Sequence, residues 1–183
     1  MPAAIDGATD IIFTAGARSG RPVREATVKA IEYEGMRHTL GAARSAGFGG
    51  RFMYMNSSGV DRRSLATIAL NLYKGNTLVW RRRAEQSIRE SGLAYTIIRA
   101  GFLLNRPGGT HPIVVTQRTL PLSPRYRIAR ADVAEAFVAA LDHPRTIGAT
   151  FDVVWGKRGE RQPWPVLLSS LRTDGHEPLG ATG

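Results

Sequence analysis

Short apolar runs alternate with segments of helical periodicity along the first hundred residues of this chain. Three runs are too short for buried helices and have the composition of buried strands: 10–15 (DIIFTA), 51–58 (RFMYMNSS) and 94–101 (AYTIIRAG). Two segments carry apolar residues near helical spacing and stop at a glycine: 23–46 and 78–91. Because consecutive parallel strands need long right-handed crossovers, this alternation predicts neighbouring parallel strands in chain order, covered by helices on both faces.

The pattern is less regular in the second half of the chain. Four elements are expected: an edge strand at 111–117 (HPIVVTQ), a helix over 133–141 with Asp132 as its N-cap, a strand at 149–156 (ATFDVVWG) and a terminal helix at 163–171 (PWPVLLSSL). The expected fold class is therefore α/β, a three-layer sandwich with a mostly parallel sheet and helices on both faces. Residues 1–183 are expected to form one domain, because their length and 43% hydrophobic content suit a single core.

The composition limits the partners of the chain. Its 25 Lys and Arg residues against 15 Asp and Glu residues give a net charge of +10, which favours acidic partners, yet nucleic acid is not expected because base composition alone produces arginine-rich enzymes. The absence of cysteine excludes disulfides and thiolate chemistry, and four histidines without paired spacing predict no metal site. Without a long apolar span or a signal peptide, a cytoplasmic protein with no membrane association is expected.

Three consecutive arginines, Arg81–Arg83, lie within the second predicted helix. Successive helical residues are about 100° apart, so these side chains cannot form one flat basic face. The run is interpreted mainly as the solvated side of an amphipathic helix whose apolar stripe includes Trp80 and Ile88. A cofactor-facing Arg81 and a nucleic-acid contact are the alternatives.

Small residues follow each of the first three predicted strands. In open parallel sheets ligands bind beyond the carboxyl ends of the strands, where small residues admit a flat ligand and serine hydroxyls both donate and accept hydrogen bonds. The candidate ligand-binding residues are Thr14, Ala15, Gly16, Ser57, Ser58, Ala100, Gly101 and Phe102. Tight turns capped by serine are the alternative. The loop GARSG (16–20) lacks a full phosphate-binding signature and is interpreted as a turn.

The chain resembles the atypical short-chain dehydrogenase/reductases, the NAD(P)-binding, NmrA-like group, through six segments in order: DIIFTAG, IEYEGMRHTLGAARSAG, RFMYMNSSG, LVWRRRAEQSIRESGLAYTIIRAG, RADVAEAFVAALD and TFDVVWG. The resemblance implies a partial Rossmann-like fold and NAD or NADP as cofactor. It implies that Thr14–Gly16 lie by the adenine ribose, that Ser57 is the active-site serine and that Ala100–Phe102 pass beside the nicotinamide.

The sequence departs from this family in two places. No Gly-rich dinucleotide turn follows a first strand, so 10–15 resembles the family's fourth strand, and a missing first half with weak or absent NAD(P) binding is expected. The family's Tyr-x-x-x-Lys pair, in which lysine lowers the pKa of tyrosine, falls on Thr77 and Arg81. A threonine hydroxyl cannot replace that acid, although Arg81 can still hold a ribose or phosphate.

The sequence leaves three functions open. The first is an NAD(P)-dependent oxidoreductase in which Ser57 polarises an unidentified small-molecule substrate. The second is a nucleotide-binding or regulatory module without turnover, and the third is a basic nucleic-acid-binding protein. The strand at 10–15 has no proline and only Asp10 as a charge, so an unpaired edge there is expected to cause self-association or to recruit a partner chain.

Overall fold

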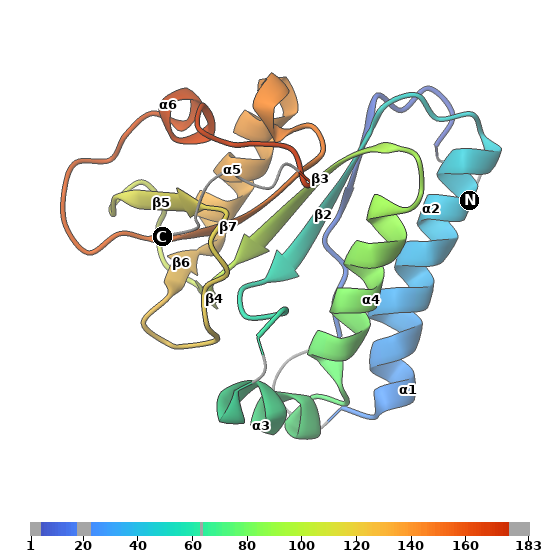
Figure 1. The fold of residues 1–183 in the computed structure, drawn as a ribbon, viewed down its shortest axis with the longest axis horizontal. Helices are drawn as coiled ribbons and strands as arrows, with labels where there is room; N and C mark the ends of the chain where they lie inside the picture. The colour runs from blue at the N-terminus through green and yellow to red at the C-terminus, as the bar shows by residue number, and fades with distance from the viewer. Residues whose placement is uncertain (1–4, 18–22, 63, 176–183) are drawn as a thin grey trace, which may run out of the picture.

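A five-stranded sheet runs through the centre of the computed structural model, which describes residues 5–17, 23–62 and 64–175 (Figure 1). Its strands, in order across the sheet, are β1 (Asp10–Phe13), β2 (Arg51–Ser57), β3 (Ala94–Ala100), β7 (Ala149–Trp155) and β5 (Ile113–Thr116). The first four strands are parallel and β5 is antiparallel to β7. The expected order, the parallel pairing and the edge strand are all confirmed.

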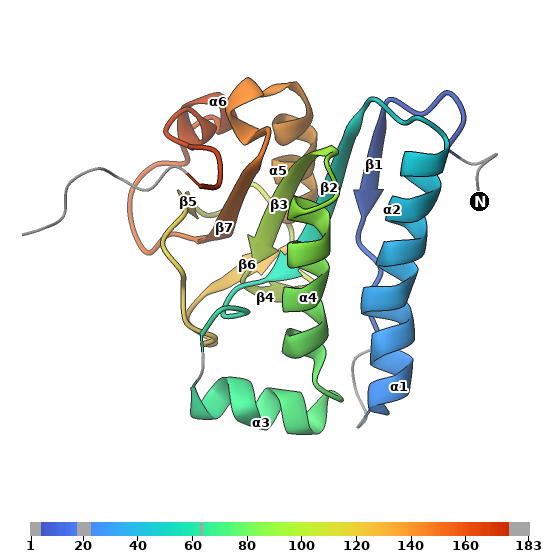
Figure 2. The ribbon, with the colours of Figure 1, turned by 45° about the vertical axis from the view of Figure 1, so that its right-hand side comes forward.

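Helices cover both faces of this sheet, as Figures 1 and 2 show. On one face, α1 (Glu25–Val28), the π-helical turn η2 (Lys29–Glu34) and α2 (Gly35–Ser45) follow one another directly and pack beside α4 (Thr77–Arg89). On the other face lie α5 (Arg130–Asp142), the short 3₁₀ turn η3 (Pro144–Thr146) and α6 (Trp164–Leu168). The three-layer α/β sandwich is therefore confirmed.

Alternating side chains of the central strands build a core on each side of the sheet. Phe52 and Tyr54 of β2 pack with Ile88 of α4 and with residues of α2. Met53, which lies between them in the strand, packs in the opposite core with residues of α5 such as Phe137. This period of two explains why β2 is apolar on both faces, as expected for a strand covered on both sides.

One helix and a small sheet of two strands were not expected from the sequence. The segment between the second strand and the second predicted helix, which was interpreted as a polar loop, contains α3 (Leu65–Tyr73), whose N-terminus has a capping box formed by Ser64 and Thr67. In addition, β4 (Phe102–Leu104) and β6 (Arg127–Ala129) form a separate two-stranded parallel sheet.

The predicted role of Asp132 as an N-cap is wrong. Helix α5 begins at Arg130, with Ala129 as its N-cap, so Asp132 lies inside the first turn. Its buried carboxylate accepts hydrogen bonds from Gly109 N at 2.8 Å, Trp155 Nε1 at 2.7 Å and Arg161 Nη1 at 2.9 Å. Asp132 therefore links the first turn of α5 to three residues that are distant in the sequence. A capping rule considers only neighbouring residues and could not predict these contacts.

β1 lies at one edge of the sheet and, among the described residues, pairs only with β2. The side chain of Ile12 is exposed on this strand. The predicted self-association through this edge stays a prediction. In the described part of the chain, no helix is long and apolar enough to cross a membrane.

Replacing Trp80 by alanine is expected to lower the free energy of unfolding by about 3–5 kcal/mol, because the ring is buried between α4 and the η2 segment. The ring lies 5.4 Å from the Tyr33 ring, and Nε1 donates a hydrogen bond to Glu25 Oε1 at 3.1 Å. The neighbouring Arg83 is exposed and its guanidinium lies 4.7 Å from the centre of the same ring, so Arg83→Ala should lower stability by no more than about 1 kcal/mol. Urea unfolding of both variants checks the orientation of α4, and equal losses would contradict it.

Candidate functional site

A cavity of about 460 Å³ lies at the carboxyl ends of β1, β2 and β3. Eight of the nine candidate residues line it: Thr14, Gly16, Ser57, Ser58, Arg81, Ala100, Gly101 and Phe102. The ninth, Ala15, is exposed and does not line the cavity. Residues that are far apart in the sequence thus meet at the edge where a parallel sheet binds its ligands.

The ends of the central strands are held together by short-range contacts. The Ser58 amide donates to the Ala100 carbonyl at 2.9 Å, and the Gly101 amide donates to the Val153 carbonyl at 3.2 Å. Among the described residues, the Ser57 hydroxyl donates one hydrogen bond, of 3.2 Å, to the carbonyl of Ser58. Because this contact is long, a ligand oxygen at the cavity wall can compete for the Ser57 proton.

Ser58 lines the cavity, but its hydroxyl is buried and has no hydrogen bond of normal geometry within the part of the chain that the structure describes. The Ser58 hydroxyl acts on Asp152 of β7, whose Oδ1 is also buried and has no hydrogen bond of normal geometry among the described residues. Burial raises the pKa of Asp152 to about 6, although the Ser58 hydroxyl and the positive charge of Arg99 both act to lower it. The Ser58 hydroxyl is therefore buried in the wall of the cavity. The Ser57 hydroxyl is the more available of the two for a hydrogen bond to a ligand.

Arg81 forms a two-pronged ion pair with Glu32 of η2 on the cavity wall. Its Nε donates to Glu32 Oε2 at 3.0 Å and its Nη2 to Glu32 Oε1 at 3.1 Å. The Thr77 hydroxyl donates to the same carboxylate at 2.5 Å, and the Ala17 amide does so at 3.0 Å. Burial disfavours the charge of Arg81, but Tyr54 and Glu32 outweigh this effect and raise its pKa.

The interpretation of Arg81 as part of a solvated face is therefore wrong, whereas it holds for Arg83. Arg82 is intermediate, since it donates to the Val60 carbonyl and lies 3.7 Å from the Asp61 carboxylate. Arg81 faces the cavity with its charge neutralised, and Thr77 has its proton committed to Glu32. The two positions that match the family's Tyr-x-x-x-Lys pair thus form a structural contact with a carboxylate in place of a proton-transfer pair.

The sequence interpretation missed several residues of the cavity wall, among them Glu32, Lys74, Tyr126 and Arg130. No local pattern could have found Glu32, because its partner Arg81 lies 49 residues away in the sequence. The contact with Tyr126 is reflected in the sequence at one position, the glycine after the third strand. A Cβ atom at Gly101 would lie 2.5 Å from the Tyr126 carbonyl oxygen, so only glycine lets the 121–126 segment close against the strand ends.

A buried network of charges holds the loop that follows Ser58. Arg99 of β3 donates to Glu85 at 2.6 Å and contacts the Asp61 carboxylate at 2.5 Å. The Asn56 side-chain amide donates to the other oxygen of Glu85 at 2.6 Å. Because Asp61 belongs to the loop and Glu85 to α4, this network fixes the serine-bearing loop to the sheet and to the helix.

The residues that line the cavity suit a negatively charged ligand that contains a flat ring. Of the described residues, Lys74, Arg81 and Arg130 line it together with one carboxylate, that of Glu32, whose charge is already paired. Gly16 and Ala100 give small surfaces at the rim, and Ser57 offers a hydroxyl. Among the described residues, no group of His, Asp and Glu is arranged to hold a metal ion.

A parallel sheet with helices on both faces and a cavity at its strand ends defines the class of Rossmann-like nucleotide-binding proteins. A family model described as NAD(P)H-binding matches residues 1–144. The chain therefore belongs to this NAD(P)H-binding family, and it is an oxidoreductase-like member of the atypical short-chain dehydrogenase/reductase type. NAD or NADP is the cofactor of the family, and the lining described above fits such an anionic dinucleotide.

Individual relatives support this assignment. The chain is 47% identical over 81 residues to sanguinarine reductase of Eschscholzia californica, covering 43% of this chain and 29% of that protein. It is 35% identical over 157 residues to the uncharacterized sugar epimerase YhfK of Bacillus subtilis (strain 168), covering 85% of this chain and 67% of that protein. The structure of a putative NAD-dependent epimerase/dehydratase from Bacillus halodurans superimposes with a TM-score of 0.74 and 26% identity, over 93% of this chain and 73% of that one.

Proposed function

We propose that the cavity binds NAD(P) and that the chain is an oxidoreductase in which Ser57 polarises the substrate. One observation carries the proposal: residues that follow three separate strands converge on a single cavity. When bound, the reduced nicotinamide supplies a hydride. The Ser57 hydroxyl is the open donor at the wall, and it can stabilise the charge that develops on a substrate oxygen.

Thr77 does not act as the proton donor in this proposal. Its hydroxyl proton is directed at Glu32 at 2.5 Å, and an aliphatic hydroxyl is too weak an acid to deliver a proton near neutral pH. The proton that completes a reduction is therefore expected to come from water in the cavity. The similarity to sanguinarine reductase makes that alkaloid a substrate to test, together with quinones and flavins.

A second candidate, nucleotide binding without turnover, is favoured by a specific observation. Arg81 and Thr77 both hold Glu32, so neither is available for the proton relay of the family. Turnover assays with NADH and NADPH over the same substrate panel distinguish the two candidates. Oxidation of the nucleotide with any acceptor supports the oxidoreductase, and binding without oxidation supports the second candidate.

The isolated chain is expected to bind NAD(P)H weakly, with a dissociation constant above about 100 µM, because the described residues contain no Gly-rich turn for the pyrophosphate. The loop 16–20, the remaining candidate for that role, lies partly outside the described residues. Fluorescence titration and calorimetry with NADH and NADPH measure the constant. A value in the low micromolar range would contradict the expected weakness, and no binding at millimolar nucleotide would overturn the proposed function.

A further inference from the structure

Helix α3 presents apolar side chains to solvent along its outer side. Leu65, Ile68, Leu72 and Tyr73 are 87%, 53%, 81% and 48% exposed. Their spacing of three, four and one residues places them on one side of a helix. The helix sequence, LATIALNLY, contains no charged residue. An exposed apolar stripe of this kind is typical of a surface that contacts another protein or a membrane.

The position of α3 leaves this stripe uncovered. Figures 1 and 2 show α3 at one end of the molecule, below the sheet, where it packs mainly against α4. Thr67 is its only buried residue, and Leu70 turns to the cavity. The outer residues therefore contribute little to the core, and their apolar character needs another explanation.

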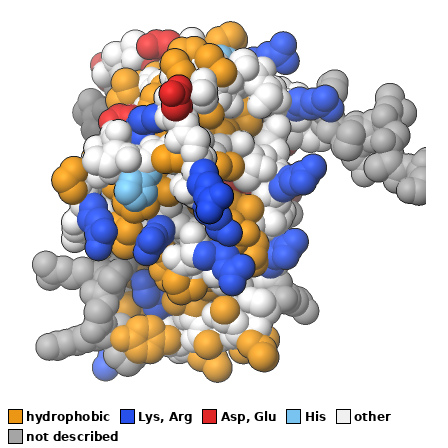
Figure 3. Space-filling model, turned by 90° about the vertical axis from the view of Figure 1, so that its left-hand side faces the viewer, with side chains coloured by type: hydrophobic (Ala, Val, Ile, Leu, Met, Phe, Trp, Pro, Cys, Tyr) orange, Lys and Arg blue, Asp and Glu red, His pale blue; other side chains and the backbone are white. Residues whose placement is uncertain are grey.

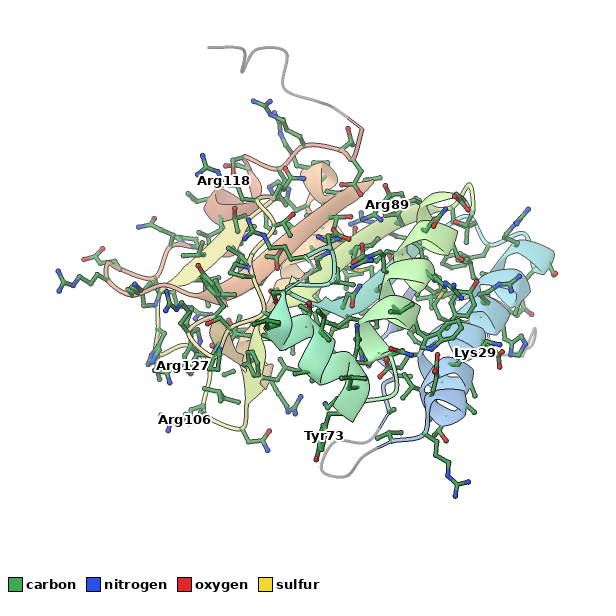
Figure 4. All side chains as sticks on the ribbon, turned by 60° about the horizontal axis from the view of Figure 1, so that its bottom comes forward. Lys29, Tyr73, Arg89, Arg106, Arg118 and Arg127 are labelled. Carbon is green, nitrogen blue, oxygen red and sulfur yellow. The ribbon has the colours of Figure 1, made fainter. Side chains whose placement is uncertain are left out.

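A basic surface adjoins the apolar stripe. Residues 100–131 contain five arginines and no aspartate or glutamate. Among these, Arg106 and Arg127 are exposed, and Figure 4 shows both extending outward on the side that carries β4 and β6. Figure 3 shows hydrophobic side chains gathered at the lower end of this face and a band of Lys and Arg side chains above them.

We propose that α3 docks on an anionic lipid surface, with its leucines and isoleucine in the interface and the neighbouring arginines at the headgroups. Apolar side chains and basic residues on one face are the two features that together anchor peripheral proteins. A second copy of the chain fits this face less well, because two such surfaces would bring like charges together. Docking of this kind needs no membrane-spanning helix, so it revises the expectation of no membrane association.

This docking does not depend on the proposed oxidoreductase activity. Since Leu70 of the same helix lines the cavity, docking would bring the cavity close to the lipid surface. The proposal can therefore be tested by vesicle binding alone, with the chain free of nucleotide.

Vesicle flotation tests the proposal. The chain should float with phosphatidylcholine vesicles that contain about 30% phosphatidylglycerol, and only weakly with phosphatidylcholine alone. The variant L65S/I68S/L72S should bind the anionic vesicles about tenfold more weakly or worse, because three inserted apolar side chains are lost. The matched control V138S/V166S replaces exposed valines on α5 and α6 and should float as the unmodified chain does.

A second pair of variants tests whether binding to vesicles depends on the arginines near α3. The variant R106Q/R127Q should weaken binding to anionic vesicles by about tenfold at low salt, because each lost arginine removes an attraction to the headgroups. The variant R37Q/R44Q lowers the net charge equally on α2, on the far side of the molecule, and should change binding less than about twofold. Circular dichroism confirms that each variant is folded, and Leu65→Ser alone replaces the triple variant if that fails.

Three results would overturn the proposal. The first is no flotation of the unmodified chain with anionic vesicles, and the second is equal flotation of the α3 variant. The third is a dimer, measured by light scattering, that L65S/I68S/L72S dissociates, since α3 would then be an interface between two copies.

Discussion

Replacing Glu85 by alanine is expected to lower the free energy of unfolding by about 3–5 kcal/mol, because breaking a buried ion pair leaves a buried charge without its partner. The Glu85 carboxylate is completely buried and is bound by Arg99, Asn56 and Arg89. Without it, the buried Arg99 keeps one ion pair among the described residues, with the partly exposed Asp61, and a weaker electrostatic interaction with Asp152. An under-compensated buried charge and an unsatisfied amide on Asn56 both destabilise the folded state.

Urea unfolding monitored by circular dichroism measures this loss. Glu90→Ala is the matched control, because Glu90 is an exposed glutamate at the end of the same helix, and its change should stay within about 0.5 kcal/mol. A loss for Glu85→Ala as small as that of the control would show that the carboxylate network does not hold β3 and α4 together. The loss of a cooperative transition would agree with the expected size of the effect.

Replacing Ser57 by alanine is expected to reduce kcat by about 100- to 1000-fold, because the variant removes a donor that stabilises developing charge on the substrate oxygen. The affinity for NAD(P)H should change by less than about threefold, since the nucleotide retains the backbone and basic side chains of the rim. Steady-state kinetics on the best acceptor of the quinone, flavin and alkaloid panel gives kcat, and fluorescence titration gives the affinity.

Ser123→Ala is the matched control for this effect. Ser123 lines the same cavity from the 121–126 segment, and its loss should change kcat by less than about threefold. Equal reductions for the two serines would mean that Ser57 acts through the shape of the cavity and not as a donor. A chain that oxidises NAD(P)H with none of the acceptors would instead favour the nucleotide-binding module without turnover.

Much of the site could be predicted because its residues follow strands. Ser57 ends β2, and Gly101 immediately follows β3, so recognising the strands was enough to bring both residues to one edge. The position of Arg81 along its helix could also be assigned from the sequence. The direction of its side chain could not be assigned. The interpretation of the arginine run used only the polarity of α4, whereas the Glu32 carboxylate that binds Arg81 lies on the neighbouring segment η2.

By itself, the sequence determined the central parallel strands, their order and the helices that cover them. Hydrophobic periodicity is a property of neighbouring residues, and right-handed crossovers leave few ways to arrange such elements. Only the tertiary structure decided the pairing of Glu32 with Arg81, the acceptor role of Asp132 and the short sheet of β4 and β6. These contacts join residues 23 to 49 positions apart, and their strength depends on burial and distance in space, which no local pattern records.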